Sequence, residues 1–119
     1  QDVENLLAFG GFRPGHDVLQ VDPPQSYGIA AYAAMTARVE ALGGERACIH
    51  PHGGNMMSFA VVAGLGLGGC EAYPGVFGAF GGYAEGMVVA DGMLSLPDWP
   101  GIGFEHQPAL FPLMQEMTP

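Results

Sequence analysis

Hydrophobic residues recur every three or four positions in two stretches, 3–9 and 29–42, and a glycine pair follows each stretch. That spacing places the apolar side chains on one face of a helix, so we expect helices there, the second one starting from Ser26. A third stretch, 56–65, is apolar on every side, and Asn55 is a residue type that caps helices. We therefore expect a buried helix over 56–65, and a last short helix near 109–117.

Short apolar runs separate these helices. Residues 18–22, 47–50 and 70–73 each form such a run, bounded by proline or glycine, which is typical of buried strands. Strand, helix, strand, helix, strand is the order of a parallel α/β sheet. Residues 88–94 differ, because the Asp91-Gly92 pair at their centre is a hairpin signal.

An ionisable residue ends each expected strand: Asp22, then His50 or His52, then Glu71. In a parallel barrel the carboxyl ends of the strands meet on one face, so these side chains would share a pocket. An aspartate beside a histidine fixes the ring tautomer and makes it a general acid or base. The alternative is that each polar residue marks only the point where a strand emerges into solvent.

The His50-Pro51-His52 sequence also has the spacing of a two-histidine metal site. No carboxylate lies within a few residues to complete such a site, so the signal is weak. Gly53 and Gly54, placed before a helix, could present N–H groups to an anion, although an ordinary tight entry into a packed helix explains them better.

Composition narrows the possible partners. The chain of 119 residues has 3 Lys+Arg against 12 Asp+Glu, a net charge of −9, which excludes a nucleic-acid or anionic-membrane partner. Hydrophobic residues make up 49% and charged residues only 13%, so we expect much of the surface to face other protein. Cys48 and Cys70 lack metal-ligand spacing, and we expect free thiols in a reducing cytoplasm.

Long ordered motifs resemble one known family. The resemblance is carried by PHGGNMMS at 51–58, AGLGLGGCEAYP at 63–74 and LPDWPGIGFE at 96–105. Shorter matches are GGFRP at 10–14, LQVD at 19–22 and SYG at 26–28. Together they resemble the enolase superfamily, and within it the mandelate-racemase-like acid-sugar dehydratases, tartrate dehydratases among them.

The resemblance implies a fold and a chain division. It implies strands six to eight of a (β/α)7β TIM-like barrel, with a tail returning to an α+β capping domain. Residues 1–73 would be the carboxyl-terminal part of the barrel, and residues 74–119 the segment packing on barrel and cap. The chain would thus be a fragment of a longer, cytoplasmic and oligomeric enzyme, inactive by itself, whose metal ligands precede Gln1.

The resemblance also implies a reaction and its residues. It assigns His52 as the catalytic histidine, Asp22 as its partner, and Glu71 as the group near the substrate carboxylate. The reaction would be Mg²⁺-dependent loss of water from an acid sugar or a tartrate-like diacid. A racemase or epimerase of a 2-hydroxy acid is the alternative within the superfamily. A small, non-catalytic module binding metal through His50 and His52 is the alternative outside it.

Overall fold

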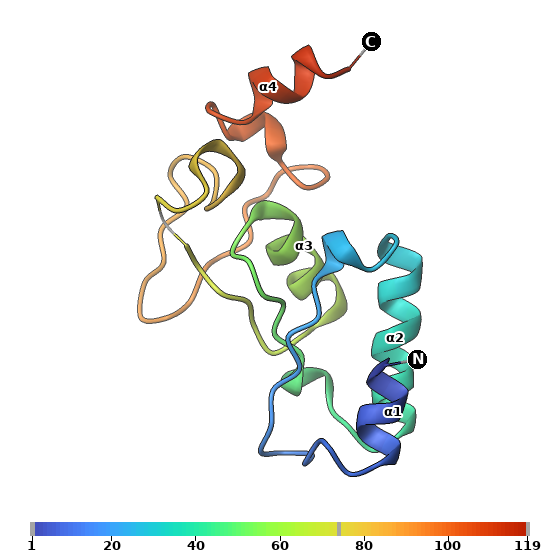
Figure 1. The fold of residues 1–119 in the computed structure, drawn as a ribbon. Coiled ribbons are helices and arrows are strands. Elements are labelled where there is room, and N and C mark those ends of the chain that lie inside the picture. The colour runs from blue at the N-terminus through green and yellow to red at the C-terminus, as the bar shows by residue number, and fades with distance from the viewer. Residues whose placement is uncertain (1, 74, 119) are drawn as a thin grey trace.

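Four α-helices hold most of the regular structure of the chain. The computed structural model describes residues 2–73 and 75–118. Its α-helices are α1 (Asp2–Ala8), α2 (Ile29–Ala41), α3 (Met56–Leu65) and α4 (Phe111–Glu116), shown in Figure 1. Single turns of 3-10 helix lie between them: η1 (Pro23–Gln25), η2 (Arg46–Cys48), η3 (Gly78–Phe80) and η4 (Phe104–His106).

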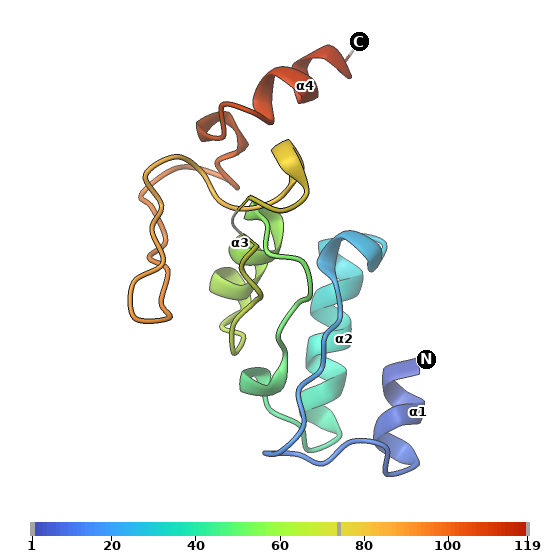
Figure 2. The ribbon, with the colours of Figure 1, turned by 60° about the vertical axis from the view of Figure 1, so that its left-hand side comes forward.

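The two helices predicted from the early periodic stretches are confirmed as α1 and α2. They lie side by side (Figures 1 and 2), and an ion pair from Arg38 Nε to Glu4 Oε1 at 2.7 Å joins them. The turn after α2 needs glycine, because a Cβ at Gly44 would come within 2.5 Å of the Val39 side chain. Helical periodicity therefore predicted both helices and the glycine turns that end them. The predicted start of the second helix at Ser26 is wrong, because α2 begins at Ile29.

The core lies between α2 and the extended segments beside it. Its buried members are Phe12, Leu19, Tyr32, Val39, Cys48 and Ile49. The helix contributes Tyr32 and Val39, both fully buried, and the extended segments contribute Leu19 and Ile49. Burying apolar surface is the main favourable term in folding, so this cluster fixes where segments 18–22 and 47–50 run.

Helix α3 begins where the sequence predicted. Asn55 is its N-cap, and its Oδ1 accepts a hydrogen bond from the Ser58 N–H at 2.9 Å. Gly66, in the left-handed conformation with φ of 63°, ends the helix. The expected burial is only partly right, because only Met56, Ser58 and Phe59 are buried. The rest of this apolar helix is half-buried or, at Ala63 and Gly64, exposed.

The predicted parallel sheet is wrong, and with it the assignment to a (β/α)7β barrel. The described residues contain no sheet: segments 18–22 and 47–50 meet through one parallel bridge, Leu19 to Ile49. Part of the second segment is the 3-10 turn η2, and residues 70–73 form no strand. The protein is mostly helical, and it is not strands six to eight of a barrel.

Two prolines explain why the backbone pairing between segments 18–22 and 47–50 stops after one bridge. Pro23 and Pro51 lack the N–H that a growing ladder needs, so pairing does not continue past either residue. Segment 70–73 approaches the second segment through a single backbone hydrogen bond, from Glu71 N–H to the Pro51 carbonyl at 3.3 Å. Apolar runs of four or five residues thus become extended connections rather than strands.

The carboxyl-terminal end of the chain is loosely attached. The predicted hairpin turn is confirmed as one antiparallel bridge, Ala90 to Met93, with positive φ at Asp91 (51°) and Gly92 (74°). The predicted last helix is α4, which has no buried residue and extends away from α1–α3 in Figure 2. Pro74, at the expected chain division, lies outside the described residues.

The overall dimensions reflect this loose attachment. The radius of gyration is 15.4 Å, against about 13.5 Å expected for a compact domain of this length. No helix within residues 2–73 and 75–118 is long and apolar enough to cross a membrane. Both cysteines are free, with Cys48 buried and Cys70 half-buried.

Candidate functional site

Asp22 stands at the end of the first extended segment. The Leu19 N–H donates to the Cys48 carbonyl at 2.8 Å, and the His50 N–H donates to the Leu19 carbonyl at 2.9 Å. The Tyr32 hydroxyl holds the same segment from α2, donating to the Val21 carbonyl at 2.9 Å. These contacts place the Asp22 carboxylate opposite the chain that follows His50.

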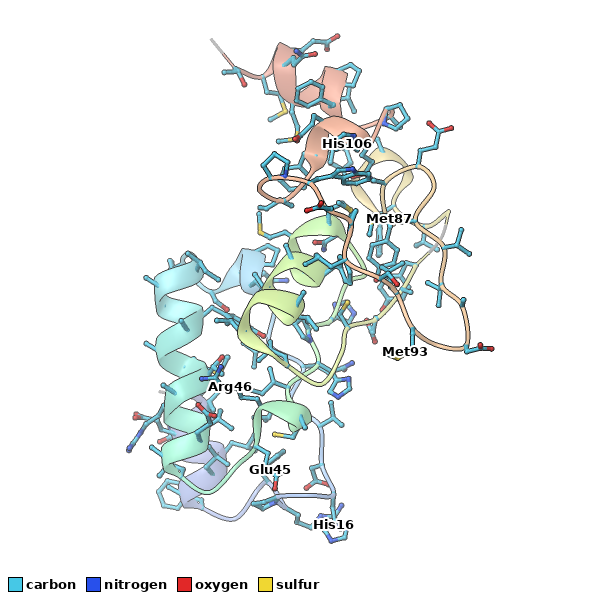
Figure 3. The ribbon with its side chains drawn as sticks, turned by 180° about the vertical axis from the view of Figure 1, so that it is seen from behind. His16, Glu45, Arg46, Met87, Met93 and His106 are labelled. Atoms are coloured by element: carbon cyan, nitrogen blue, oxygen red, sulfur yellow. The ribbon has the colours of Figure 1, made fainter. Side chains whose placement is uncertain are left out.

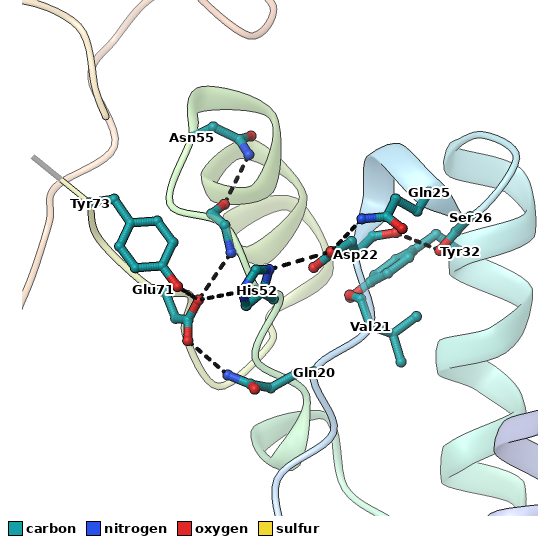
Figure 4. Close-up of polar contacts among 11 residues, drawn as sticks. Gln20, Val21, Asp22, Gln25, Ser26, Tyr32, His52, Asn55, Glu71 and Tyr73 are labelled. Carbon is teal, nitrogen blue, oxygen red and sulfur yellow. Dashed lines mark hydrogen bonds and ion pairs between the residues drawn. The ribbon is translucent and has the colours of Figure 1, made fainter. Parts of the chain in front are cut away.

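His52 lies between two carboxylates, as Figure 4 shows. Its Nδ1 is 3.7 Å from Asp22 Oδ2, and its Nε2 is 3.7 Å from Glu71 Oε2. The imidazole is half exposed, at 54%, whereas the Asp22 side chain is 16% exposed and the Glu71 side chain 31%. A titratable ring open to solvent and flanked by two largely covered anions is suited to proton transfer.

A close backbone contact brings Glu71 to this place. A Cβ at Gly54 would lie 2.3 Å from the Glu71 carbonyl oxygen and 2.6 Å from Ala72 Cα. Only glycine therefore allows the two chain segments to approach so closely. The contact fixes the position of Glu71 relative to the neighbouring His52.

Hydrogen bonds fix the Glu71 carboxylate. Its Oε2 accepts from the Tyr73 hydroxyl and from the Gly53 N–H at 3.1 Å, and its Oε1 accepts from Gln20 Nε2 at 3.1 Å. The Tyr73 hydroxyl and then the Gly53 N–H lower the pKa of Glu71, because both stabilise its ionised form. The same contact raises the pKa of the Tyr73 hydroxyl. Glu71 is thus a fixed anion in this site.

Asp22 is held more loosely. Its Oδ2 accepts from Gln25 Nε2 at 3.0 Å, and its backbone carbonyl accepts from the Ser26 hydroxyl at 2.6 Å. Its Oδ1 is buried and has no hydrogen-bond partner. Most buried polar atoms are paired, so this carboxylate has unused capacity to accept a proton donor.

A cavity of about 460 Å³ opens beside His52. Its walls combine polar groups with two phenylalanines: Asp22, Pro24, Gln25, His52, Gly53, Gly54, Asn55, Phe77, Phe80 and Gly81. Ligand sites of this size are usually lined by apolar groups with a few polar ones. The cavity can therefore bring a small molecule against the imidazole.

The structure brings together Asp22, His52 and Glu71, the three residues singled out from the sequence. His50, the other candidate at the end of segment 47–50, is not part of this group. The Nε2 of His50 is 3.0 Å from the Ala47 carbonyl oxygen, which only accepts, so this nitrogen carries a proton. A Cβ at Gly68 would lie 2.3 Å from it.

The remaining two histidines are remote from the site. His16 and His106 lie at opposite ends of the molecule (Figure 3), and His106 stacks on Trp99 with ring centroids 3.8 Å apart. Both are exposed.

Sequence reasoning missed several residues that shape the site. Tyr73 lies two positions after Glu71, a spacing that places both side chains on one side of an extended chain, and this signal could have identified it. Gln20 had no such signal, because it reaches Glu71 across 51 positions of the sequence. Phe77 packs on Tyr73 only four residues away, and it was also missed.

The donor set for the implied Mg²⁺ is not present in the described part of the chain. No group of three or more His, Cys, Asp and Glu residues in that part could hold a metal ion. Mg²⁺ requires near-octahedral oxygen ligands, whereas Asp22 and Glu71 lie on opposite sides of His52 and three donors already occupy Glu71. These residues do not fit a magnesium site.

Comparison with known protein families finds no matching family. The geometry around His52 is therefore the main ground for a functional proposal.

Proposed function

We propose that this protein is a hydro-lyase that removes water from a hydroxy acid, an acid sugar or a tartrate-like diacid, by proton transfer at His52. One observation carries the proposal: the half-exposed imidazole lies 3.7 Å from a carboxylate on each side, at the edge of a cavity. The motif resemblance to acid-sugar dehydratases supplies the substrate class. The proposal retains the dehydration reaction that the resemblance implies, and it does not require the barrel fold.

The proposed reaction uses His52 twice. The neutral imidazole takes the proton on the carbon next to the substrate carboxylate. The electrons of that C–H bond form a C=C bond as the C–O bond to the neighbouring hydroxyl breaks. The protonated imidazole then gives its proton to the departing hydroxyl, so that water leaves, and the enol product tautomerises to a 2-keto acid.

Asp22 and Glu71 assist in different ways. Asp22 Oδ2 faces Nδ1 at 3.7 Å and would accept the proton on that nitrogen, which would keep the imidazole oriented through both transfers. Glu71, ionised and held by three donors, stabilises the imidazolium that forms between the two transfers. No step is assigned to Mg²⁺, because the described residues present no set of ligands for it.

The arginines do not contribute a cation to this site. Arg13, Arg38 and Arg46 form ion pairs elsewhere, with Asp17, Glu4 and Glu40 respectively. A substrate carboxylate would meet two anions at His52, so the ionic conditions of the assay matter. The assay is therefore run both with MgCl₂ and with EDTA.

The test measures 2-keto acid formation from tartrate isomers and sugar acids by the 119-residue chain. The resemblance implies that these residues are inactive by themselves, because it places the metal ligands before Gln1. The proposal differs on this point, so the 119-residue chain is assayed directly. We expect turnover that His52→Asn reduces by roughly 10²–10⁴-fold, the usual contribution of a positioned acid or base. His50→Asn is the matched control and should retain turnover, with folding of both variants checked by circular dichroism.

Two results would overturn the proposal: no turnover of any of these acids, or equal turnover by the wild type and His52→Asn. Loss of optical rotation with deuterium uptake but no keto acid would replace dehydration by racemisation. The two-histidine metal module would have to bind metal through the Nδ1 of His50, because its Nε2 donates to the Ala47 carbonyl.

A further inference from the structure

Two carboxylates lie just beyond hydrogen-bond distance of the ring nitrogens of His52, and either one can accept the proton of the neutral ring after a small movement. Asp22 Oδ2 faces Nδ1 and Glu71 Oε2 faces Nε2, both at 3.7 Å. The acceptor that takes the proton determines which nitrogen is left as a base, since the second nitrogen then keeps its lone pair. Distance alone does not decide between the two carboxylates.

The acceptor capacity of the two carboxylates does differ. A carboxylate offers about four lone-pair sites on its two oxygens. On Glu71, the Tyr73 hydroxyl and the Gly53 N–H both donate to Oε2, the oxygen that faces His52. On Asp22, the facing oxygen accepts one hydrogen bond, from Gln25, and the other oxygen accepts none.

Tyr73 is well placed to maintain this difference. Its ring meets the His52 ring edge-on, with centroids 6.1 Å apart and planes at 68°. The Phe77 ring holds it from the other side at 5.6 Å and 76°. Figure 4 shows the hydroxyl directed at the Glu71 carboxylate. The ionisable groups that contact His52 are therefore Asp22, Glu71 and Tyr73.

We infer that Tyr73 is a positioning residue: by occupying Oε2 of Glu71 together with the Gly53 N–H, its hydroxyl leaves Asp22 to accept the ring proton of His52 and keeps Nε2 as the base. The inference rests on the proposed function only for what Nε2 does next. Without the hydroxyl, Glu71 has a free lone pair facing Nε2. It then captures this nitrogen in a hydrogen bond.

The test reads the tautomer of His52 by ¹⁵N nuclear magnetic resonance at alkaline pH, where the imidazole is neutral. Protonated and unprotonated ring nitrogens have separate ¹⁵N shifts, and comparison with His52→Asn assigns the signals. We expect Nδ1–H in the wild type. In Tyr73→Phe the tautomer ratio should move toward Nε2–H by about tenfold or more, the effect of one hydrogen bond to a charged group.

The control is Tyr83→Phe. The Tyr83 hydroxyl also contacts Glu71, but it donates to the backbone carbonyl at 2.9 Å and not to the carboxylate. Tyr83→Phe should therefore leave the tautomer ratio unchanged. Tyr73→Phe in a Glu71→Gln background should also have no effect, because the competing anion is already absent.

Three results would overturn the inference: an Nε2–H tautomer in the wild type, no change in Tyr73→Phe, or an equal change in Tyr83→Phe. A purely structural role for Tyr73 would lower stability without changing the tautomer. No substrate is used, so the outcome does not depend on whether the protein dehydrates a hydroxy acid. Failure of the proposed function and failure of this inference are thus distinguished.

Discussion

The contact between Gly54 and Glu71 leads to a quantitative prediction for Gly54→Ala. The new methyl group would lie 2.3 Å from the Glu71 carbonyl oxygen, where ordinary contacts begin at 3.4 Å. The two segments must therefore separate by about 1 Å. Gly54 is not among the residues with positive φ, so the whole effect comes from this contact.

The separation should affect both stability and the site. Overpacking of this kind destabilises proteins by about 1–3 kcal/mol, and we expect that loss in the free energy of unfolding measured in urea. Displacing Glu71 by about 1 Å relative to His52 should reduce turnover by roughly 10²-fold. It should also change the ¹⁵N signals of the His52 ring.

Gly64→Ala is the matched control. Gly64 lies in α3, and a Cβ there meets nothing within 4 Å. The same change should stabilise the protein by up to about 1 kcal/mol, because alanine favours a helix interior over glycine. Wild-type stability and unchanged His52 signals in Gly54→Ala would refute the role given to this contact.

Three further predictions concern stability, all measured by urea unfolding. Asn55→Ala removes the N-cap of α3 and should lower the free energy of unfolding by about 1 kcal/mol, whereas Asn55→Asp should retain most of it. Tyr32→Phe removes the hydroxyl that donates to the Val21 carbonyl, and it should lower the free energy of unfolding by about 1 kcal/mol. Hydrogen bonds from Arg13 lower the pKa of Asp17 from 3.8 to about 2, so their stabilisation is present above pH 3.8 and is lost as the pH falls toward 2. Asp17→Asn should therefore lose less unfolding free energy than the wild type as the pH falls from 3.8 to 2. An equal loss in both proteins would contradict this prediction.

The helices could be predicted from the sequence because their signals are local. The apolar period of α2 and the cap at Asn55 both act within a few residues of the chain, and the structure has both. The strands could not be predicted in the same way. A run such as 47–50 becomes a strand only if neighbours pair along it, and here one bridge at Ile49 is all that forms.

The residues of the site could be predicted from the sequence, but the contacts that bring them together could not. The ends of the apolar runs indicated Asp22, Glu71 and either His50 or His52, the resemblance selected His52, and the three residues do meet. They meet through one bridge, a glycine contact and side-chain hydrogen bonds instead of through a common sheet edge. The role of Tyr73 depends on how many donors reach one oxygen, which no spacing in the sequence encodes.

The single bridge between Leu19 and Ile49 has a consequence for the order of folding. Helix α2 forms from contacts within one continuous segment. The bridge, in contrast, joins the two ends of a loop of roughly 30 residues that contains α2, and closing this loop costs about 3 kcal/mol of conformational entropy. The site assembles only after that closure. Opening the bridge therefore separates Asp22 from His52 without first requiring α2 to unwind, so the geometry of the His52 site can be lost before helical content is.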